Sequence, residues 1–248
     1  MSARAAHRWP WPAVIAHRCG GLLAPENSIE GLVRAQAIGC RGAEFDAMLA
    51  ACGTPVLMHD DTLERTTTGR GRVAQTSWAA LSQVALKTRD GSVSAEAIPS
   101  LAMALDACLR LGMTPNIEIK PSAGADHATG RAVADVAAAL WQRPGVTPPL
   151  LSSFSPAALE AAALAAPALP RALLLEFVQD DSLVVAHALG CVAVVVEQSQ
   201  LGPQLIAQAH DAGLGIAIYT ENDAERGQQS LASGLDGLIT DRPERFLR

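Results

Sequence analysis

The chain lacks several features that mark particular classes of protein. Apolar runs such as residues 192–196 are too short to span a bilayer, and Pro10 and Pro12 interrupt the N-terminal stretch where a leader would need its apolar core. No segment is dense in basic residues, and the formal net charge is -6. We therefore expect a cytoplasmic protein that neither inserts into membranes nor binds nucleic acid. The sequence does not predict an oligomeric partner.

Paired cysteines are also missing. The five cysteines are an odd number and include no C-x-x-C pair, which argues against a disulfide framework or a zinc site and favours a reducing compartment. We expect most of them to be small buried hydrophobic residues. Cys19 is set apart because it follows His17 and Arg18 directly.

Apolar residues make up 49% of the 248 residues and charged residues 18%, which is typical of one well-buried globular domain over 1–248. Short apolar or β-branched runs alternate with longer helical segments. Eight strands are expected, at 14–18, 42–46, 116–120, 150–154, 171–177, 192–197, 215–220 and 236–240.

The segments between these strands carry helix signals. Asn27 and Ser100 are candidate N-caps, Gly112 is a stop signal, and Asn222 with Glu225 resembles a capping box. Prolines 156 and 203 stand at first helical positions. Eight strand–helix units in about 240 residues predict a single-domain (β/α)8 TIM barrel, with an open doubly wound sheet as the alternative.

The region from about 47 to 99 interrupts this alternation. Residues 54–58 resemble a strand, yet they follow the second strand too closely for a parallel crossover, so we expect an antiparallel hairpin with its turn at 51–53. Residue 46 should then lie roughly opposite residue 59. The rest of the region is expected to form a rim excursion with one short helix, at about 77–86.

Carboxylates stand at the ends of two predicted strands. Glu44 and Asp46 are two residues apart and therefore share a face, as do Glu118 and Lys120. Catalytic groups of such barrels lie where the strands end. Three carboxylates meeting there would repel one another unless a hard divalent cation, Mg²⁺ or Ca²⁺, neutralised them.

Histidines and cations accompany these carboxylates. His17 and Arg18 end the first strand, His59 ends the hairpin, and Lys120 is one of only two lysines in the chain. With a bound cation, this set fits hydrolysis of a phosphate diester by two acid–base groups. The other histidines are expected to be ordinary surface or capping residues: His7, His127, His187 and His210.

An ordered series of motifs makes the sequence more specific. The runs are AHRCGG at 16–21, APENS at 24–28, GAEFD at 42–46, PVLMHD at 55–60, NIEIK at 116–120, SSF at 152–154 and DGLITD at 236–241. Together they resemble the glycerophosphodiester phosphodiesterase family, most closely its short cytoplasmic bacterial members. The resemblance covers about residues 13–245.

The resemblance implies one divalent cation held by Glu44, Asp46 and Glu118, with His17 and His59 as the acid–base pair. It places Arg18 and Lys120 on the substrate phosphate, and Phe154 and Tyr219 in the substrate pocket. A small-molecule glycerophosphodiester would yield glycerol 3-phosphate and an alcohol.

Two positions depart from the family pattern. Cys19 stands where glycine is usual, and Tyr219 stands where the family often has tryptophan. If position 19 needs a positive φ, cysteine strains the loop unless Gly20 and Gly21 make the turn instead. Tyr219 leaves the preferred head group open.

Two other functions are possible in principle. A non-catalytic phosphodiester-binding barrel should lack a histidine or a carboxylate of the set, and none is missing. A related lysophospholipid or phosphoinositide phosphodiesterase would favour an export signal or a docking segment, and neither is evident.

Overall fold

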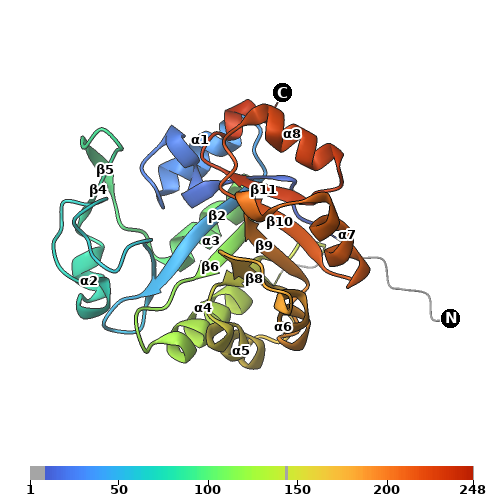
Figure 1. Ribbon diagram of the computed structural model, residues 1–248. Coiled ribbons are helices and arrows are strands. Elements are labelled where there is room, and N and C mark those ends of the chain that lie inside the picture. Colours follow the sequence, from blue (N-terminus) through green and yellow to red (C-terminus); the bar gives the residue numbers. More distant parts are fainter. Residues whose placement is uncertain (1–8, 143–144, 248) are drawn as a thin grey trace.

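The computed structural model describes residues 9–142 and 145–247 and shows a closed barrel surrounded by helices (Figure 1). Its main sheet has nine strands: eight parallel barrel strands and β3. The first strand pairs with both the second and the last, which closes the barrel and excludes the open doubly wound sheet. The barrel strands are β1 (Val14–Ala16), β2 (Gly42–Leu49), β6 (Thr114–Ile119), β7 (Leu150–Ser153), β8 (Arg171–Leu175), β9 (Ala193–Glu197), β10 (Gly215–Tyr219) and β11 (Gly237–Thr240).

Helices separate these strands on the outside of the barrel, as expected for parallel strand pairing. Ser100 caps α3 through the backbone N–H of Met103, and Gly112 ends that helix in the left-handed conformation, both as predicted. Prolines begin α5 and α7, also as predicted. The helices are α1 (Ile29–Ala37), α2 (Trp78–Leu81), α3 (Leu101–Leu111), α4 (Asp126–Leu140), α5 (Pro156–Ala165), α6 (Ser182–Ala188), α7 (Pro203–Asp211) and α8 (Ala224–Ala232).

Alternation along the strands sorts side chains between the helices and the barrel interior. Phe45 is fully buried in the cluster that β2 shares with α1 and α3, so its neighbours Glu44 and Asp46 face the opposite way, into the barrel. The interior at the other end of the barrel is apolar, with Trp11, Ile15 and Leu174 in one cluster and Trp9 packed against it. The polar side chains are thereby confined to the end of the barrel where the strands finish.

The predicted hairpin is present as β2 paired antiparallel with β3 (Pro55–Leu57). Its turn lies at 51–53, as predicted, but the register is shifted by one. Met58, not residue 59, is opposite Asp46, since the Met58 N–H donates to the Asp46 carbonyl at 3.1 Å. His59 lies one residue beyond this pairing, so it reaches the mouth from the loop that follows β3.

The excursion after β3 contains more structure than predicted. The helix expected at 77–86 is only α2, and an unpredicted two-stranded sheet follows, formed by β4 (Ala85–Lys87) and β5 (Val93–Ala97). A separate apolar cluster that includes Met48, Val56 and Leu81 supports this unit. In Figure 1 the unit stands to the left of the barrel, beside the strand ends of β2 and β6.

Several local predictions were wrong. Ser28 caps α1 and Asp223 caps α8, whereas Asn27 and Asn222 were expected to do so. Five strands end one or two residues before the predicted limit, which leaves His17, Arg18, Lys120 and Phe154 just beyond their strands. Cys52 is exposed, unlike the other four cysteines.

His7 lies outside the described residues. Within those residues, no helix combines the length and apolar character needed to cross a bilayer.

Candidate active site

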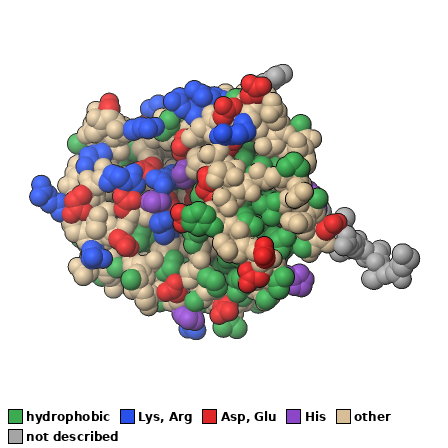
Figure 2. All heavy atoms as spheres, viewed as in Figure 1, with side chains coloured by type: hydrophobic (Ala, Val, Ile, Leu, Met, Phe, Trp, Pro, Cys, Tyr) green, Lys and Arg blue, Asp and Glu red, His purple; other side chains and the backbone are tan. Residues whose placement is uncertain are grey.

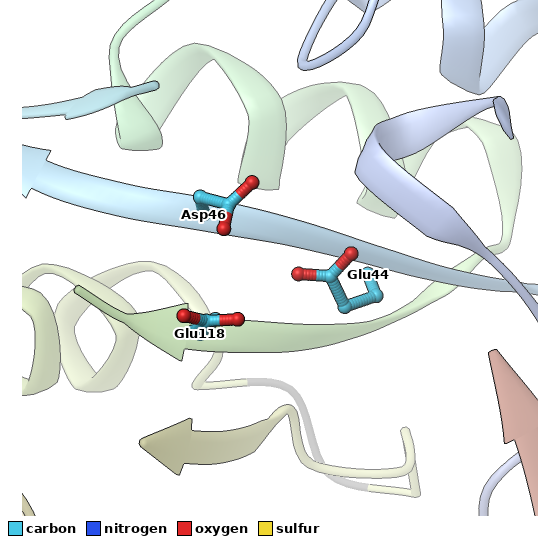
Figure 3. A group of neighbouring side chains, drawn as sticks. All are labelled: Glu44, Asp46 and Glu118. Atoms are coloured by element: carbon cyan, nitrogen blue, oxygen red, sulfur yellow. The ribbon is translucent and has the colours of Figure 1, made fainter. Parts of the chain in front are cut away.

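Three carboxylates converge at the mouth of the barrel. Glu44 and Asp46 extend from β2 and Glu118 extends from the neighbouring strand β6, where Asp46 and Glu118 are register partners. One oxygen from each lies within 4.8 Å of one from each of the others, and Figure 3 shows the three groups pointing toward one another. The geometry predicted from strand alternation is therefore observed.

Two of the carboxylates are buried, Glu44 at 3% exposed and Asp46 at 1%, and Glu118 is half-buried. Burial, followed by the charges of Asp46 and Glu118, raises the pKa of Glu44 well above its usual value. Burial and then Asp46 raise the pKa of Glu118 to about 7. Burial would also raise the pKa of Asp46, but His59, Arg18, Lys120 and a hydrogen bond from Asn27 outweigh it and lower that pKa. The cationic and hydrogen-bonding groups of the protein therefore do not fully offset the negative charge of the three carboxylates.

Two cations approach the carboxylates from the sides. Lys120 Nζ donates to Glu118 Oε1 at 3.1 Å and lies 3.8 Å from Asp46 Oδ1. Arg18 Nε is 3.7 Å from Asp46 Oδ2, and the backbone N–H of Arg18 donates to Glu44 Oε2 at 2.9 Å. Burial lowers the pKa of Lys120, but Glu118 and Asp46 outweigh burial, so Lys120 remains charged.

His17 is held by a carboxylate from the last strand. Its Nδ1 lies 2.7 Å from Asp241 Oδ1, and Asn222 Nδ2 donates to the other oxygen of Asp241 at 3.0 Å. The second ring nitrogen, Nε2, faces the carboxylates and is 3.9 Å from Glu44 Oε2. One nitrogen of His17 is therefore fixed while the other is directed into the site.

His59 is arranged in the same way. Its Nδ1 lies 2.7 Å from Asp60 Oδ1, and Arg65 donates to both oxygens of Asp60, at 2.6 and 2.8 Å. Glu26 accepts from Arg65 and from Arg18, which connects the two sides of the mouth. Burial lowers the pKa of His59 despite the opposing charge of Asp46, so this imidazole is mainly neutral at pH 7.

An aromatic pair forms another wall of the site. The rings of Phe154 and Tyr219 meet edge to face with centroids 5.8 Å apart. Both rings line a small pocket of about 20 Å³, together with His17, Glu44 and Glu118. A pocket of this size accommodates a guest similar to one water molecule or ion.

The loop after β1 brings His17 and Arg18 into position through unusual backbone conformations. Cys19 itself takes a positive φ of 76°, so the glycines that follow do not relieve it of this strain. Gly21 also has a positive φ, of 60°, and a Cβ there would lie 2.3 Å from the backbone oxygen of Asp241. This close approach places the loop against the residue that holds His17.

The residues that support the site were not predicted from the sequence. Asp60 and Asp241 hold the two histidines, while Asn27 donates to Asp46 Oδ2 at 2.9 Å and accepts from the Asp46 backbone N–H. Each lies within a motif that carries the family resemblance, which was the available signal. Their partners, however, are up to 224 residues away in sequence.

Buried acidic groups with half-buried basic and imidazole groups at the mouth of the barrel define an active site of the TIM-barrel enzyme class. The glycerophosphoryl diester phosphodiesterase family model matches residues 17–245. The chain belongs to this family and is an enzyme of the phosphodiesterase class.

Individual relatives agree with the family match. A phosphodiesterase of Oleispira antarctica, solved with the product sn-glycerol-3-phosphate, is 32% identical, with a TM-score of 0.86 and coverage of 95% of both chains. The glycerophosphodiester phosphodiesterase of Caldanaerobacter subterraneus is 27% identical over 94% of this chain and 96% of that protein. Mouse glycerophosphodiester phosphodiesterase 1 is 36% identical over 111 residues, 44% of this chain, and the match spans only about a third (34%) of the mouse protein.

Proposed function

We propose that the enzyme hydrolyses glycerophosphodiesters to glycerol 3-phosphate and an alcohol, with a divalent cation, Mg²⁺ or Ca²⁺, at Glu44, Asp46 and Glu118. The observation that carries this proposal is the convergence of three carboxylates, two of them buried and the third half-buried, beside Nε2 of His17. The family membership and the product bound by the Oleispira enzyme support the choice of substrate. We further propose that the barrel and its excursion act as one domain.

The residues at the mouth fit a hard cation. All three candidate ligands offer oxygen, the donor that Mg²⁺ and Ca²⁺ prefer. The buried Glu44 Oε1 has no hydrogen-bond partner within the described part of the chain, and a buried acceptor without a partner costs about 1–3 kcal/mol. A bound cation would satisfy this oxygen and would supply Lewis-acid stabilisation of the phosphoryl oxygens.

Arg18 and Lys120 are proposed to bind the phosphate. Each lies beside the carboxylates, and the buried Arg18 Nε has no hydrogen-bond partner among the described residues. Fixed cations near the phosphoryl group stabilise the charge that develops on its oxygens. Phe154 and Tyr219 are proposed to pack against the glycerol carbons.

His17 and His59 are proposed to move protons through their Nε2 atoms. In each ring a carboxylate holds Nδ1 at 2.7 Å, which favours one ring orientation and one tautomer. One imidazole takes a proton from the attacking nucleophile, which is either water or a neighbouring hydroxyl of the substrate whose cyclic phosphate product water then opens, and the other donates a proton to the leaving alkoxide. The arrangement supports the pair and leaves both assignments of acid and base open.

The basic test is release of glycerol 3-phosphate from glycerophosphocholine. We expect product to appear with added Mg²⁺ or Ca²⁺, to stop when a chelator is added, and to resume when the cation is restored. Coupled detection of glycerol 3-phosphate measures this. Release of phosphocholine in place of glycerol 3-phosphate would contradict the proposed bond cleavage, and full activity in chelator would contradict the metal.

Cation binding is expected to weaken at acidic pH. Glu118 has a pKa of about 7 in the metal-free protein, so below pH 7 a proton must leave before the oxygen can bind a cation. The apparent affinity should fall by about tenfold per pH unit below pH 7, and calorimetry at pH 6 and pH 8 would measure it. An affinity that is constant from pH 6 to pH 8 would contradict the release of a proton from Glu118 when the cation binds.

The same titration bears on stability. Because the folded-state pKa of Glu118 is raised, its protonation stabilises the metal-free protein at acidic pH. This contribution is complete below the unfolded pKa of Glu, about 4.3, and is lost as the pH rises through about 7.

Replacing Asp241 by asparagine is expected to lower kcat by about 10- to 10²-fold, because His17 loses the carboxylate that orients its Nδ1. Cation affinity should stay at the wild-type value, since Asp241 is not among the three carboxylates. Steady-state kinetics and calorimetry separate these effects, and the exposed Asp135→Asn is a matched control. A fall in thermal stability that fully accounts for the lost activity would indicate a purely structural role.

A further inference from the structure

A large cleft adjoins the active site on the side away from the aromatic pair. It has a volume of about 670 Å³, within the usual range for pockets that bind small ligands. Its walls come from the loop after β1, from α1 and from the excursion, including the strand β4 and the turn that follows it. His17 lines this cleft and also the small pocket of Phe154 and Tyr219, so the two spaces meet at the same imidazole.

The cleft is basic although the whole chain has a net charge of -6. Three carboxylates line it, Glu26, Glu30 and Asp241, against five cations: Arg18, Arg34, Arg65, Lys87 and Arg89. Figure 2 shows Lys and Arg side chains gathered on the left and upper parts of this face, on the side where β4 and β5 stand in Figure 1.

The acidic residues of the cleft are already engaged. Glu26 accepts from both Arg18 and Arg65, and Glu30 pairs with Arg34 at 2.5 Å. Asp241 holds His17.

Lys87 and Arg89 differ from these cations. Within the described parts of the chain neither forms an ion pair with a carboxylate, and Lys87 Nζ donates only to the backbone oxygen of Glu64 at 2.7 Å. Both stand at the tip of the β4–β5 unit, across the cleft from the loop after β1. Two cations without counter-charges facing a cavity form a site for an anion.

The position of the cleft relative to the carboxylates indicates which part of a substrate it would hold. With the phosphate at Arg18 and Lys120, the two arms of a diester extend to opposite sides of His17. Phe154 and Tyr219, which are proposed to pack against the glycerol carbons, lie on one of these sides. The larger cleft is left for the alcohol that departs, and at 670 Å³ it exceeds what choline or ethanolamine would fill.

We propose that this cleft binds the leaving alcohol, and that Lys87 and Arg89 select glycerophosphodiesters whose alcohol carries a second anionic group, a phosphate or a carboxylate. The proposal rests on the proposed diester hydrolysis and extends it to the substrate class. The same charges disfavour cationic head groups, because like charges brought together in a cleft repel.

The test compares two substrates that differ by one phosphate, glycerophosphoinositol and glycerophosphoinositol 4-phosphate. We expect the wild-type enzyme to have the higher kcat/KM for the phosphorylated substrate. In the double variant Lys87→Ala/Arg89→Ala, the ratio of the two kcat/KM values should fall about tenfold, since each exposed charge contact is worth up to about fivefold. Arg110→Ala is the matched control and should keep the ratio. Arg110 lies on α3, is not among the residues that line the cleft, and has a side chain that is 69% exposed.

Because Lys87 also contacts the backbone of Glu64, the single variant Arg89→Glu is a second test that spares this contact. It should lower the ratio further than Arg89→Ala does, and raised salt should lower the ratio of the wild-type enzyme, because exposed charges are screened.

The outcomes separate this proposal from the proposed function. If no substrate releases glycerol 3-phosphate, the diester hydrolysis itself is wrong. If both substrates are cleaved but the ratio is unaffected by the two variants and by salt, the hydrolysis stands and the selection by Lys87 and Arg89 is wrong. An equal loss of kcat/KM on both substrates in the variants also overturns the proposed selection. If the variants lose binding to phosphatidylglycerol vesicles while the ratio is unchanged, the selection is wrong and the cations serve a membrane surface.

Discussion

Replacing Glu44 by glutamine is expected to lower the rate of glycerol 3-phosphate release by about 10³-fold, while making the metal-free protein more stable. The rate falls because an amide is a poor ligand for a hard cation, and loss of several kcal/mol of charge stabilisation corresponds to about three powers of ten. Stability rises because burial and the charges of Asp46 and Glu118 raise the pKa of Glu44 well above its usual value. The wild-type protein therefore holds an unfavourable charge whenever Glu44 ionises without a cation.

Melting curves in chelator at pH 8 would measure the second effect. A gain of about 1–3 kcal/mol is expected from relief of the buried, unpaired group, which corresponds to about 3–10 °C for a chain of this size. Added Ca²⁺ or Mg²⁺ should raise the melting temperature of the wild type much more than that of the variant. The exposed Glu160→Gln should change neither property. A variant that is less stable in chelator would contradict the view that the three carboxylates repel one another.

Removing either imidazole is expected to lower kcat by about 10²- to 10⁴-fold without abolishing cation binding. His17→Ala and His59→Ala each remove one proposed proton-transfer group, but both leave the three carboxylates in place. The exposed His127→Ala on α4 is the matched control. Initial rates with calorimetric cation binding measure both properties, and a near-wild-type rate in either variant would remove that histidine from the mechanism.

A substrate with an activated leaving group separates the two histidines. The general acid is needed less when the departing alcohol is already acidic, so a p-nitrophenyl diester should restore much of the rate to one variant and little to the other. Equal recovery in both variants would show that the two residues do not divide the proton transfers.

The barrel could be predicted from the sequence because its signals are local. Apolar strands and capped helices such as the one begun by Ser100 repeat along the chain, and the spacing of Glu44 and Asp46 is enough to direct both into the barrel. The excursion was harder because β5 is short and partly exposed, and the only large apolar residue of its sequence, VSAEA, is Val93, which is itself exposed.

The two misplaced helix caps have one cause. Asn27 and Asn222 each stand next to a second residue that can cap a helix, and local rules do not choose between neighbours. In the fold, Asn27 is engaged by Asp46 and Asn222 by Asp241, so Ser28 and Asp223 make the caps. Long-range hydrogen bonds at the site therefore determine which residue caps each helix.

The hairpin of β2 and β3 leads, in one continuous stretch of chain, from a proposed catalytic residue to a wall of the proposed alcohol-binding cleft. His59 follows its return strand, and residues 60–99 then continue into the wall that carries Lys87 and Arg89. The proposed ion site, by contrast, is built into barrel strands that neighbours on both sides restrain. Asp60 and Arg65, which hold His59, precede the two-stranded sheet, so replacement of the β4–β5 unit alone would give a modular route to new alcohol specificities, in nature or by design, without rebuilding the proposed hydrolytic centre.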